Sequence, residues 1–229
     1  MSCQTGFVLS YIKYGERDAI VHCFTKETGF QTYFLKGIFA PKSKKKAYLL
    51  PLNELTFTLS DKPSKTEIQL ATTFDANSNF DFYTDVKANT MVFFLAEFLK
   101  KTLRNENQNL TVYNEIKQLC LELDRKNYRA HFIFLVRMIQ AFGIAPLIST
   151  NTYLNPEKGL FEDSISHHLF DEHISKIWKE IDSSALPYSL QIDPSVRKQF
   201  FDSIMLYCQF HFADFRTPDS LEIVQQIFG

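Results

Sequence analysis

Basic residues are concentrated in the stretch between positions 13 and 46, which holds eight of them against only three acidic residues, in a chain whose net charge is −1. Four of the eight lie within residues 41–46. Lysines on a loop can reach phosphate groups and bind them through counterion release, without reading bases. We predict that the nucleic-acid backbone is bound by Lys13, Arg17, Lys36, Lys42, Lys44, Lys45 and Lys46. The alternative is a solvated loop whose charge only maintains solubility.

Aromatic residues accompany this basic stretch. Small barrels that bind nucleic acid pair positive charge with exposed rings on which bases stack. The candidates are Tyr11, Tyr14, Tyr33, Phe39 and Tyr48. Each tyrosine taken alone is better explained as a core residue than as a stacking platform.

A second candidate site is an apolar stretch that contains two arginines. Arg129 and Arg137 accompany Phe134 and Met138 there. An arginine beside an exposed apolar pocket suits the capture of a peptide with a hydrophobic end and a carboxylate. The alternative is an ordinary amphipathic helix with its arginines in solvent.

Catalytic and metal-binding patterns are missing from the sequence. There is no GxxxxGK[ST], GxGxxG or GxSxG, and the chain has seven glycines. The histidines at 167, 168 and 173 form the nearest approach to a cluster, without the paired spacing of a zinc site. We therefore expect a protein that is not an enzyme and has no cofactor or metal.

The cysteines and the first residues bear on the compartment. The four cysteines are far apart and form no CxxC pair, and the first residues are too polar for a signal peptide. No run of about 18 apolar residues exists. We expect a reduced, cytoplasmic location without membrane contact.

The elements that must position these residues change in type along the chain. Residues 7–14, 19–25, 30–36, 54–60 and 66–73 read as five short strands, with strict apolar alternation in the fourth. Five strands in about 70 residues, with one long basic loop, predict a small closed barrel.

From about residue 82 the apolar period becomes helical. Helices are expected around residues 91–103, 112–123 and 134–142, the last one ending at Gly143. Asp193-Pro194 and Thr217-Pro218 mark two further helix starts, the second leading to Leu221, Val224 and Phe228. The fold class is thus α+β. We place a barrel domain at 1–78 and a helical domain at 79–229, with a small hairpin near 147–168.

The amino-terminal stretch also resembles a known family. It contains Tyr14-Gly15-Glu16-x-Asp18, then Thr25-x-x-x-Gly29, Lys36-Gly37 and Lys42-Ser43. In order and spacing these motifs are similar to the amino-terminal signature of the RecO family. Weaker likeness continues at Phe142-Gly143 and Phe215-Arg216-Thr217-Pro218.

The resemblance implies an oligonucleotide-binding (OB) fold followed by a helical domain. It implies binding of single- and double-stranded DNA, annealing of complementary strands, and cooperation with RecR in replacing single-strand-binding protein by RecA at the bacterial nucleoid. It also implies that the helical domain binds the acidic carboxy-terminal tail of single-strand-binding protein, loosely at residues 129–142. An OB-fold RNA-binding module and a protein-interaction adaptor are the alternatives.

One departure from the family concerns zinc. Many RecO proteins have a four-cysteine zinc element in the helical domain, whereas residues 147–168 of this chain contain no cysteine. We expect a metal-free hairpin there, stabilised by packing of Tyr153, Leu154, Leu160 and Phe161.

Overall fold

A computed structural model describes residues 2–61, 66–77, 80–213 and 215–221 of the chain. The chain divides into two compact units, Met1–Cys120 and Leu121–Gly229, and the division falls within a helix. The predicted domain boundary at 78/79 stays a prediction. Among the described residues, no helix combines the length and the apolar character that crossing a bilayer requires.

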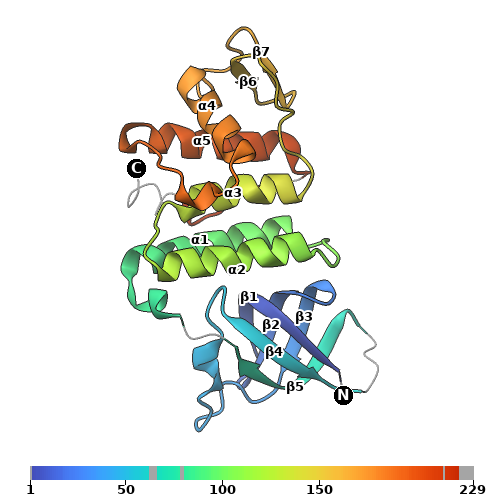
Figure 1. Cartoon of the computed structure of the whole chain (residues 1–229). Helices are drawn as coiled ribbons and strands as arrows, with labels where there is room; N and C mark the ends of the chain where they lie inside the picture. Colours follow the sequence, from blue (N-terminus) through green and yellow to red (C-terminus); the bar gives the residue numbers. More distant parts are fainter. Residues whose placement is uncertain (1, 62–65, 78–79, 214, 222–229) are drawn as a thin grey trace. The chain divides into compact units, whose positions relative to one another are not determined.

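Five strands of the first unit close into a barrel (Figure 1). They are β1 (Cys3–Tyr14), β2 (Asp18–Thr25), β3 (Gly29–Leu35), β4 (Glu54–Leu59) and β5 (Ile68–Ala76). The order around the barrel is β1-β2-β3-β5-β4, with β3 and β5 parallel and the other pairs antiparallel. The predicted five-stranded barrel is confirmed.

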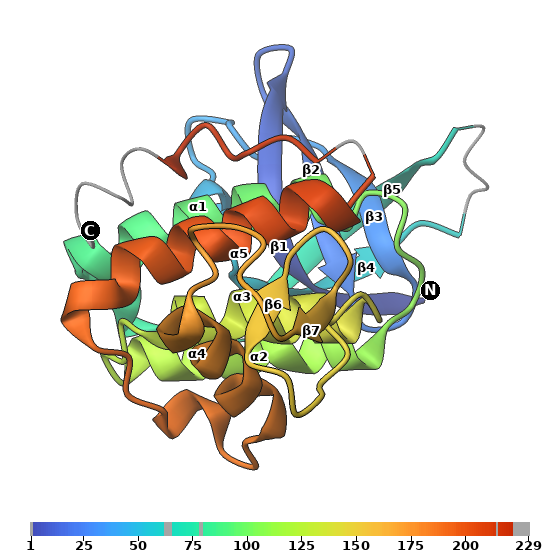
Figure 2. The same cartoon turned by 90° about the horizontal axis from the view of Figure 1, so that it is seen from above.

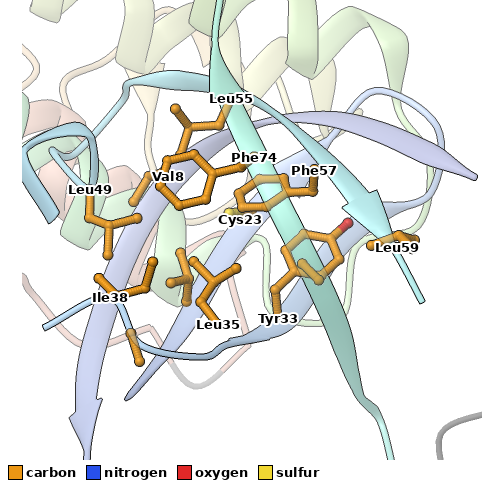
Figure 3. Close-up of a cluster of buried hydrophobic side chains, with 13 residues drawn as sticks. Val8, Cys23, Tyr33, Leu35, Ile38, Leu49, Leu55, Phe57, Leu59 and Phe74 are labelled. Atoms are coloured by element: carbon orange, nitrogen blue, oxygen red, sulfur yellow. The ribbon is translucent and has the colours of Figure 1, made fainter. Parts of the chain in front are cut away.

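The barrel interior is filled by the residues that alternate inward along each strand, as the period of two requires. Figure 3 shows this cluster, in which the rings of Tyr33 and Phe57 stack with centroids 4.5 Å apart. Ile38 and Leu49 come from the long loop between β3 and β4, and both are almost fully buried in the same core. The loop that contains the lysine run is therefore anchored at two points.

Helices α1 (Val86–Thr102) and α2 (Leu110–Asp124) follow the barrel. Asp85 caps the first by accepting a hydrogen bond from Ala88 N, and Asn109 caps the second in the same way, from Val112 N at 3.1 Å. The loop between them packs on the turn that joins β2 and β3, where Phe30 N donates to the Glu106 carbonyl at 3.0 Å.

The second unit consists mainly of helices: α3 (Ala130–Ala141), α4 (Glu172–Ser183) and α5 (Arg197–His211). Between α3 and α4, strands β6 (Tyr153–Asn155) and β7 (Leu160–Glu162) form the predicted hairpin, which Figures 1 and 2 show. The α+β class is confirmed. Helix α4 is missing from our prediction, although Asp171 caps it and Ile174, Ile177, Trp178 and Ile181 have helical spacing.

Most of the helix predicted after Thr217-Pro218 lies beyond the described residues. Leu221 is the last residue that the structure describes, so the predicted positions Val224 and Phe228 lie outside the described residues.

Candidate nucleic-acid interface

The β1–β2 hairpin extends beyond the barrel and carries two of the predicted basic residues (Figure 2). Phe39, from the loop after β3, packs against this hairpin. Phe39 N donates to the Arg17 carbonyl at 2.8 Å, and its ring lies 6.0 Å from that of Tyr11. The ammonium of Lys13 lies 5.7 Å from the centroid of the same ring. The fold thus brings the hairpin and the start of the basic loop together.

Two of the motif pieces are joined by a hydrogen bond. The Asp18 carboxylate accepts from Gly37 N at 2.8 Å, and Gly37 has a positive φ of 67°. This contact fixes the direction in which the chain leaves β3, directly after Lys36. Asp18 and Gly37, which the sequence analysis used only as family motif residues, therefore position the basic loop.

The seven predicted basic residues are all exposed, but they are not equivalent. Lys45 lies over the ring of Phe74 at 5.2 Å from its centroid, and its ammonium also donates to Thr73 Oγ1. The remaining six form no salt bridge with any residue that the structure describes: Lys13, Arg17, Lys36, Lys42, Lys44 and Lys46. Exposed cations without an acidic partner can exchange their counterions for phosphates.

The candidate stacking residues have different surroundings. Tyr11, Tyr14 and Tyr48 are about half exposed, at 46%, 57% and 47%. Tyr33 is completely buried in the barrel core, and burial raises the pKa of its hydroxyl well above the ordinary value. Tyr33 is therefore a structural residue, and the three exposed tyrosines are the ones a ligand can reach.

The outer face of the sheet carries further apolar residues that sequence reasoning missed. Ile12 lies opposite Ile20, and Ile20 lies opposite Phe34, so the three share one face of β1, β2 and β3. The ring of Tyr14 meets that of Phe34 edge to face at 5.6 Å. These residues could have been found from the sequence, because they alternate with the core residues along each strand and so lie on the opposite face of the sheet.

A second group of basic residues lies at the end of α1, far from the lysine run in sequence. Burial lowers the pKa of His22, and the positive charges of Lys100 and Arg104 lower it further. His22 lies on β2, where its ring stacks on Phe30 at 5.8 Å and Nδ1 lies 3.1 Å from Thr32 Oγ1. Sequence reasoning missed Lys100 and Arg104, because only the fold brings α1 to the barrel strands.

Comparisons with known proteins find relatives of this chain. Residues 1–75 match the family model described as Recombination protein O N terminal. The chain is 28% identical to DNA repair protein RecO of Flavobacterium psychrophilum over 235 residues, covering 97% of each chain. It is 26% identical to the proteins of the same name from Christiangramia forsetii and Flavobacterium johnsoniae, again with 97% of each chain covered.

The chain is thus similar to the RecO family along nearly its whole length, and its first 75 residues match the model of that family's amino-terminal domain. Its barrel is the OB-fold of the RecO amino-terminal domain, a five-stranded barrel closed here by the parallel pair β3 and β5. A helical part follows it, as in the predicted architecture.

The patch predicted to bind a RecO partner lies on α3. Phe134 and Met138 are both completely buried. Arg129 and Arg137 are half-buried and hydrogen-bonded, Arg129 to Gln191 Oε1 and Arg137 to Gln140 Oε1, the latter at 2.8 Å. The two arginines thus offer surface to a partner, whereas the two apolar residues serve the core in this structure.

The zinc element found in many RecO proteins does not fit these residues. Within the described ranges, no three His, Cys, Asp or Glu side chains come together as a metal site would require. The hairpin is instead held by side-chain hydrogen bonds. Ser175 Oγ accepts from Leu154 N at 2.9 Å, and His211 Nε2 lies 2.7 Å from the Pro156 carbonyl. Leu154 and Phe161 are buried as predicted, while Leu160 is 39% exposed.

Proposed function

We propose that this chain, which is similar to the RecO family, is a mediator of DNA repair and recombination that binds single- and double-stranded DNA through its barrel. One observation carries the proposal. Six exposed basic side chains, none of which forms a salt bridge with a residue that the structure describes, lie on the β1–β2 hairpin and on the loop after β3, and Phe39 joins these two segments. Such a group neutralises the phosphate backbone without reading sequence.

The proposed action is binding, without catalysis. Two complementary strands repel each other through their phosphates, and a protein that neutralises both lowers this repulsion. The strands can then meet and pair. Strand annealing follows from the charge distribution and needs neither a cofactor nor an active site.

The proposed partners follow from the similarity to the RecO family. They are RecR, the acidic carboxy-terminal tail of single-strand-binding protein and, indirectly, RecA. For the tail, we propose Arg129 and Arg137 as the residues that hold its carboxylates, because guanidinium groups suit that geometry. Fluorescence anisotropy of a labelled tail peptide, with wild type and an R129A/R137A variant, tests this. A tail affinity that is equal in both proteins contradicts the assignment.

The salt dependence of DNA binding tests the main proposal. The affinity for single-stranded DNA should fall steeply with salt, with a slope that reports the number of phosphates contacted. Replacing Lys42, Lys44, Lys45 and Lys46 with alanine should reduce this slope by about three, because each lost phosphate contact lowers it by about one. We expect less than four because Lys45 is already engaged with Thr73 and Phe74.

The matched control is K176A/K198A, which removes exposed charges from α4 and α5. An unchanged slope in the quadruple variant excludes the loop from the interface. RNA of equal length serves as a competitor, and a strong preference for RNA would favour an RNA-binding module. Absence of any nucleic-acid binding at low salt would favour a protein-interaction adaptor.

A further inference from the structure

The loop between β3 and β4 carries most of the predicted DNA-binding residues, and we call residues 36–53 the lysine loop. Consecutive turns order the backbone of its first half. Ala40 N donates to the Gly37 carbonyl at 3.1 Å, and Ser43 N donates to the Ala40 carbonyl at 2.8 Å. The loop thus follows a defined path, and the placement of its charges depends on how its two ends are held.

The two ends of the lysine loop are held differently. At the first end, Gly37 N donates to the Asp18 carboxylate. At the second end, Leu52 has a φ of 60°, in the left-handed region, where the Cβ of a residue other than glycine crowds the following carbonyl oxygen. Such a conformation persists only where the surrounding structure imposes it, and it points to a functional constraint.

Two elements of the same unit impose the conformation of Leu52. Its N donates to the Val8 carbonyl at 2.7 Å, and its own carbonyl accepts from Cys120 Sγ at 3.7 Å. Val8 N returns a bond to the Asn53 carbonyl at 3.0 Å. Val8 lies on β1 where the register with β2 shifts, and Cys120 lies on α2. The strained end of the loop is therefore fixed to both the barrel and α2.

Two polar side chains secure the residues on each side of Leu52. The Tyr83 hydroxyl donates to the Pro51 carbonyl at 2.9 Å, and Asn53 Nδ2 donates to the Tyr48 carbonyl at 2.8 Å. Burial raises the pKa of the Tyr83 hydroxyl well above its ordinary value, so the group stays a donor. Tyr48 ends the short 3-10 helix that also holds the last two lysines of the run. The bond to its carbonyl therefore acts close to the charges.

We propose that Tyr83 and Asn53 are positioning residues for DNA binding, which hold the lysine loop in the conformation that presents its ammonium groups to phosphates. This rests on the proposed function and adds uncharged residues to the same site. A loop already held in its bound conformation loses less entropy on binding, so preorganisation adds affinity without adding a contact. Loss of either hydrogen bond should therefore weaken binding while the number of phosphates contacted stays the same.

The salt dependence of DNA binding separates positioning from charge. In Y83F, the plot of log affinity against log salt concentration should shift down in parallel by about 3-fold to 10-fold, the range expected for one lost hydrogen bond. The quadruple lysine variant should instead have a smaller slope. N53A should repeat the parallel shift. Fluorescence anisotropy should give equal losses for an oligo-dT and for a duplex of equal length, because the loop binds the backbone of both.

Y207F is the matched control for Y83F. The Tyr207 hydroxyl also donates to a backbone carbonyl, that of Ile144 at 2.8 Å, but it belongs to the carboxy-terminal unit. Y207F should lower the thermal midpoint as Y83F does and bind DNA as wild type does. Asn53 is almost fully buried, so N53A can disturb the fold. Y83F removes a single oxygen atom and keeps the test decisive in that case.

A double-mutant cycle tests whether Tyr83 acts through the lysine loop. Adding Y83F to the quadruple lysine variant should lower the affinity by less than about 2-fold, because most of the groups that Tyr83 positions are already absent. A full additional loss would overturn the assignment. An equal loss in Y207F would also overturn it, and so would a loss confined to the single strand, because Tyr83 would then contact bases itself.

The outcomes separate the two proposals. If wild type binds no DNA, or if the quadruple lysine variant binds DNA as wild type does, the proposed interface fails and the positioning assignment fails with it. If the quadruple variant loses binding while Y83F and N53A match wild type, only the positioning assignment fails.

Discussion

The two units of the chain join their distant segments by different means. In the amino-terminal unit the bonds between distant elements are mostly between backbone groups, in the barrel ladders and between Phe30 N and the Glu106 carbonyl. In the carboxy-terminal unit, the hydrogen bonds between distant elements mostly involve a side chain. Trp178 Nε1 donates to Ser203 Oγ at 3.1 Å, and the Tyr207 hydroxyl donates to the Ile144 carbonyl at 2.8 Å.

This difference has a consequence for mutation and for pH. A barrel held together by backbone hydrogen bonds tolerates many side-chain changes. It is destabilised by substitutions at positions where two backbone segments lie in contact, because an added side chain separates them. A helical unit held by buried polar side chains is sensitive to the loss of one hydroxyl and to protonation. The following predictions test both halves of this contrast.

The largest loss of stability is expected for G29A. Gly29 has a φ of 80°, and a Cβ there would lie 2.3 Å from the backbone carbon of Asn107. The left-handed backbone costs roughly 1–2 kcal/mol and the overlap roughly 1–3 kcal/mol, so G29A should lower the free energy of unfolding by about 2–5 kcal/mol. Urea denaturation measures it.

Gly15 provides the matched control, because it also has a positive φ but a Cβ added there would have no other atom within 4 Å among the described residues. G15A should therefore cost only the backbone term, about 1–2 kcal/mol. Similar losses in the two variants would show that the loop between α1 and α2 does not constrain the β2–β3 turn.

The Thr25-x-x-x-Gly29 motif illustrates what a sequence can and cannot reveal. The turn itself was predictable, and Thr25 Oγ1 stabilises it by donating to the Gly29 carbonyl at 2.9 Å. The contact of Gly29 with Asn107 was not, because it joins residues whose neighbourhood only the packing of α1 and α2 creates. The same reason explains why Lys100 and Arg104 escaped prediction.

The barrel strands were predictable because an apolar period of two is local, and the lysine loop because charge is visible in composition. Helix α4 was missed although its cap and its spacing are also local, so that miss was avoidable. The partner patch shows the opposite limit. Arg137 and Phe134 belong to one helix, and sequence alone could not tell that Phe134 is in the core.

The second prediction concerns acid and the carboxy-terminal unit. Burial lowers the pKa of His131 to about 4, from an ordinary value of 6.5. Because the folded-state pKa is the lower one, the stability from neutral His131 is present above pH 6.5 and is lost as the pH falls toward 4. The loss reaches about 1.4 kcal/mol per pH unit and about 3 kcal/mol in total.

Urea denaturation of wild type and H131Q between pH 7 and pH 4 measures this loss. H131Q should have a shallower pH dependence than wild type, and H168Q, at an exposed histidine, should follow wild type. If wild type and H131Q lose stability in parallel, protonation of His131 does not contribute to acid unfolding.

The third prediction is a smaller loss from a single hydroxyl. Ser175 is completely buried, and its Oγ accepts from Leu154 N and donates to the Phe170 carbonyl at 3.1 Å. S175A should lower the free energy of unfolding by about 1–3 kcal/mol, because two buried backbone groups lose their partner. S183A, at an exposed position of the same helix, should change it by less than about 0.5 kcal/mol. If S175A and S183A change the free energy of unfolding equally, the hydrogen bonds of Ser175 do not stabilise the β6–β7 hairpin.

The smallest effect is expected from metal removal. A structural zinc contributes directly to folding, so a zinc-dependent hairpin should melt earlier in a chelator. Here Lys179 replaces such a link, with its ammonium 4.4 Å from the centroid of the Phe161 ring and donating to the Asn151 carbonyl. Incubation with EDTA should therefore leave the thermal midpoint unchanged, whereas K179A should lower it by a few degrees. Zinc bound in a one-to-one ratio, together with an EDTA-induced fall in the midpoint, would mean that ligands from elsewhere in the chain complete a metal site. Side-chain hydrogen bonds alone would then be insufficient to hold this hairpin.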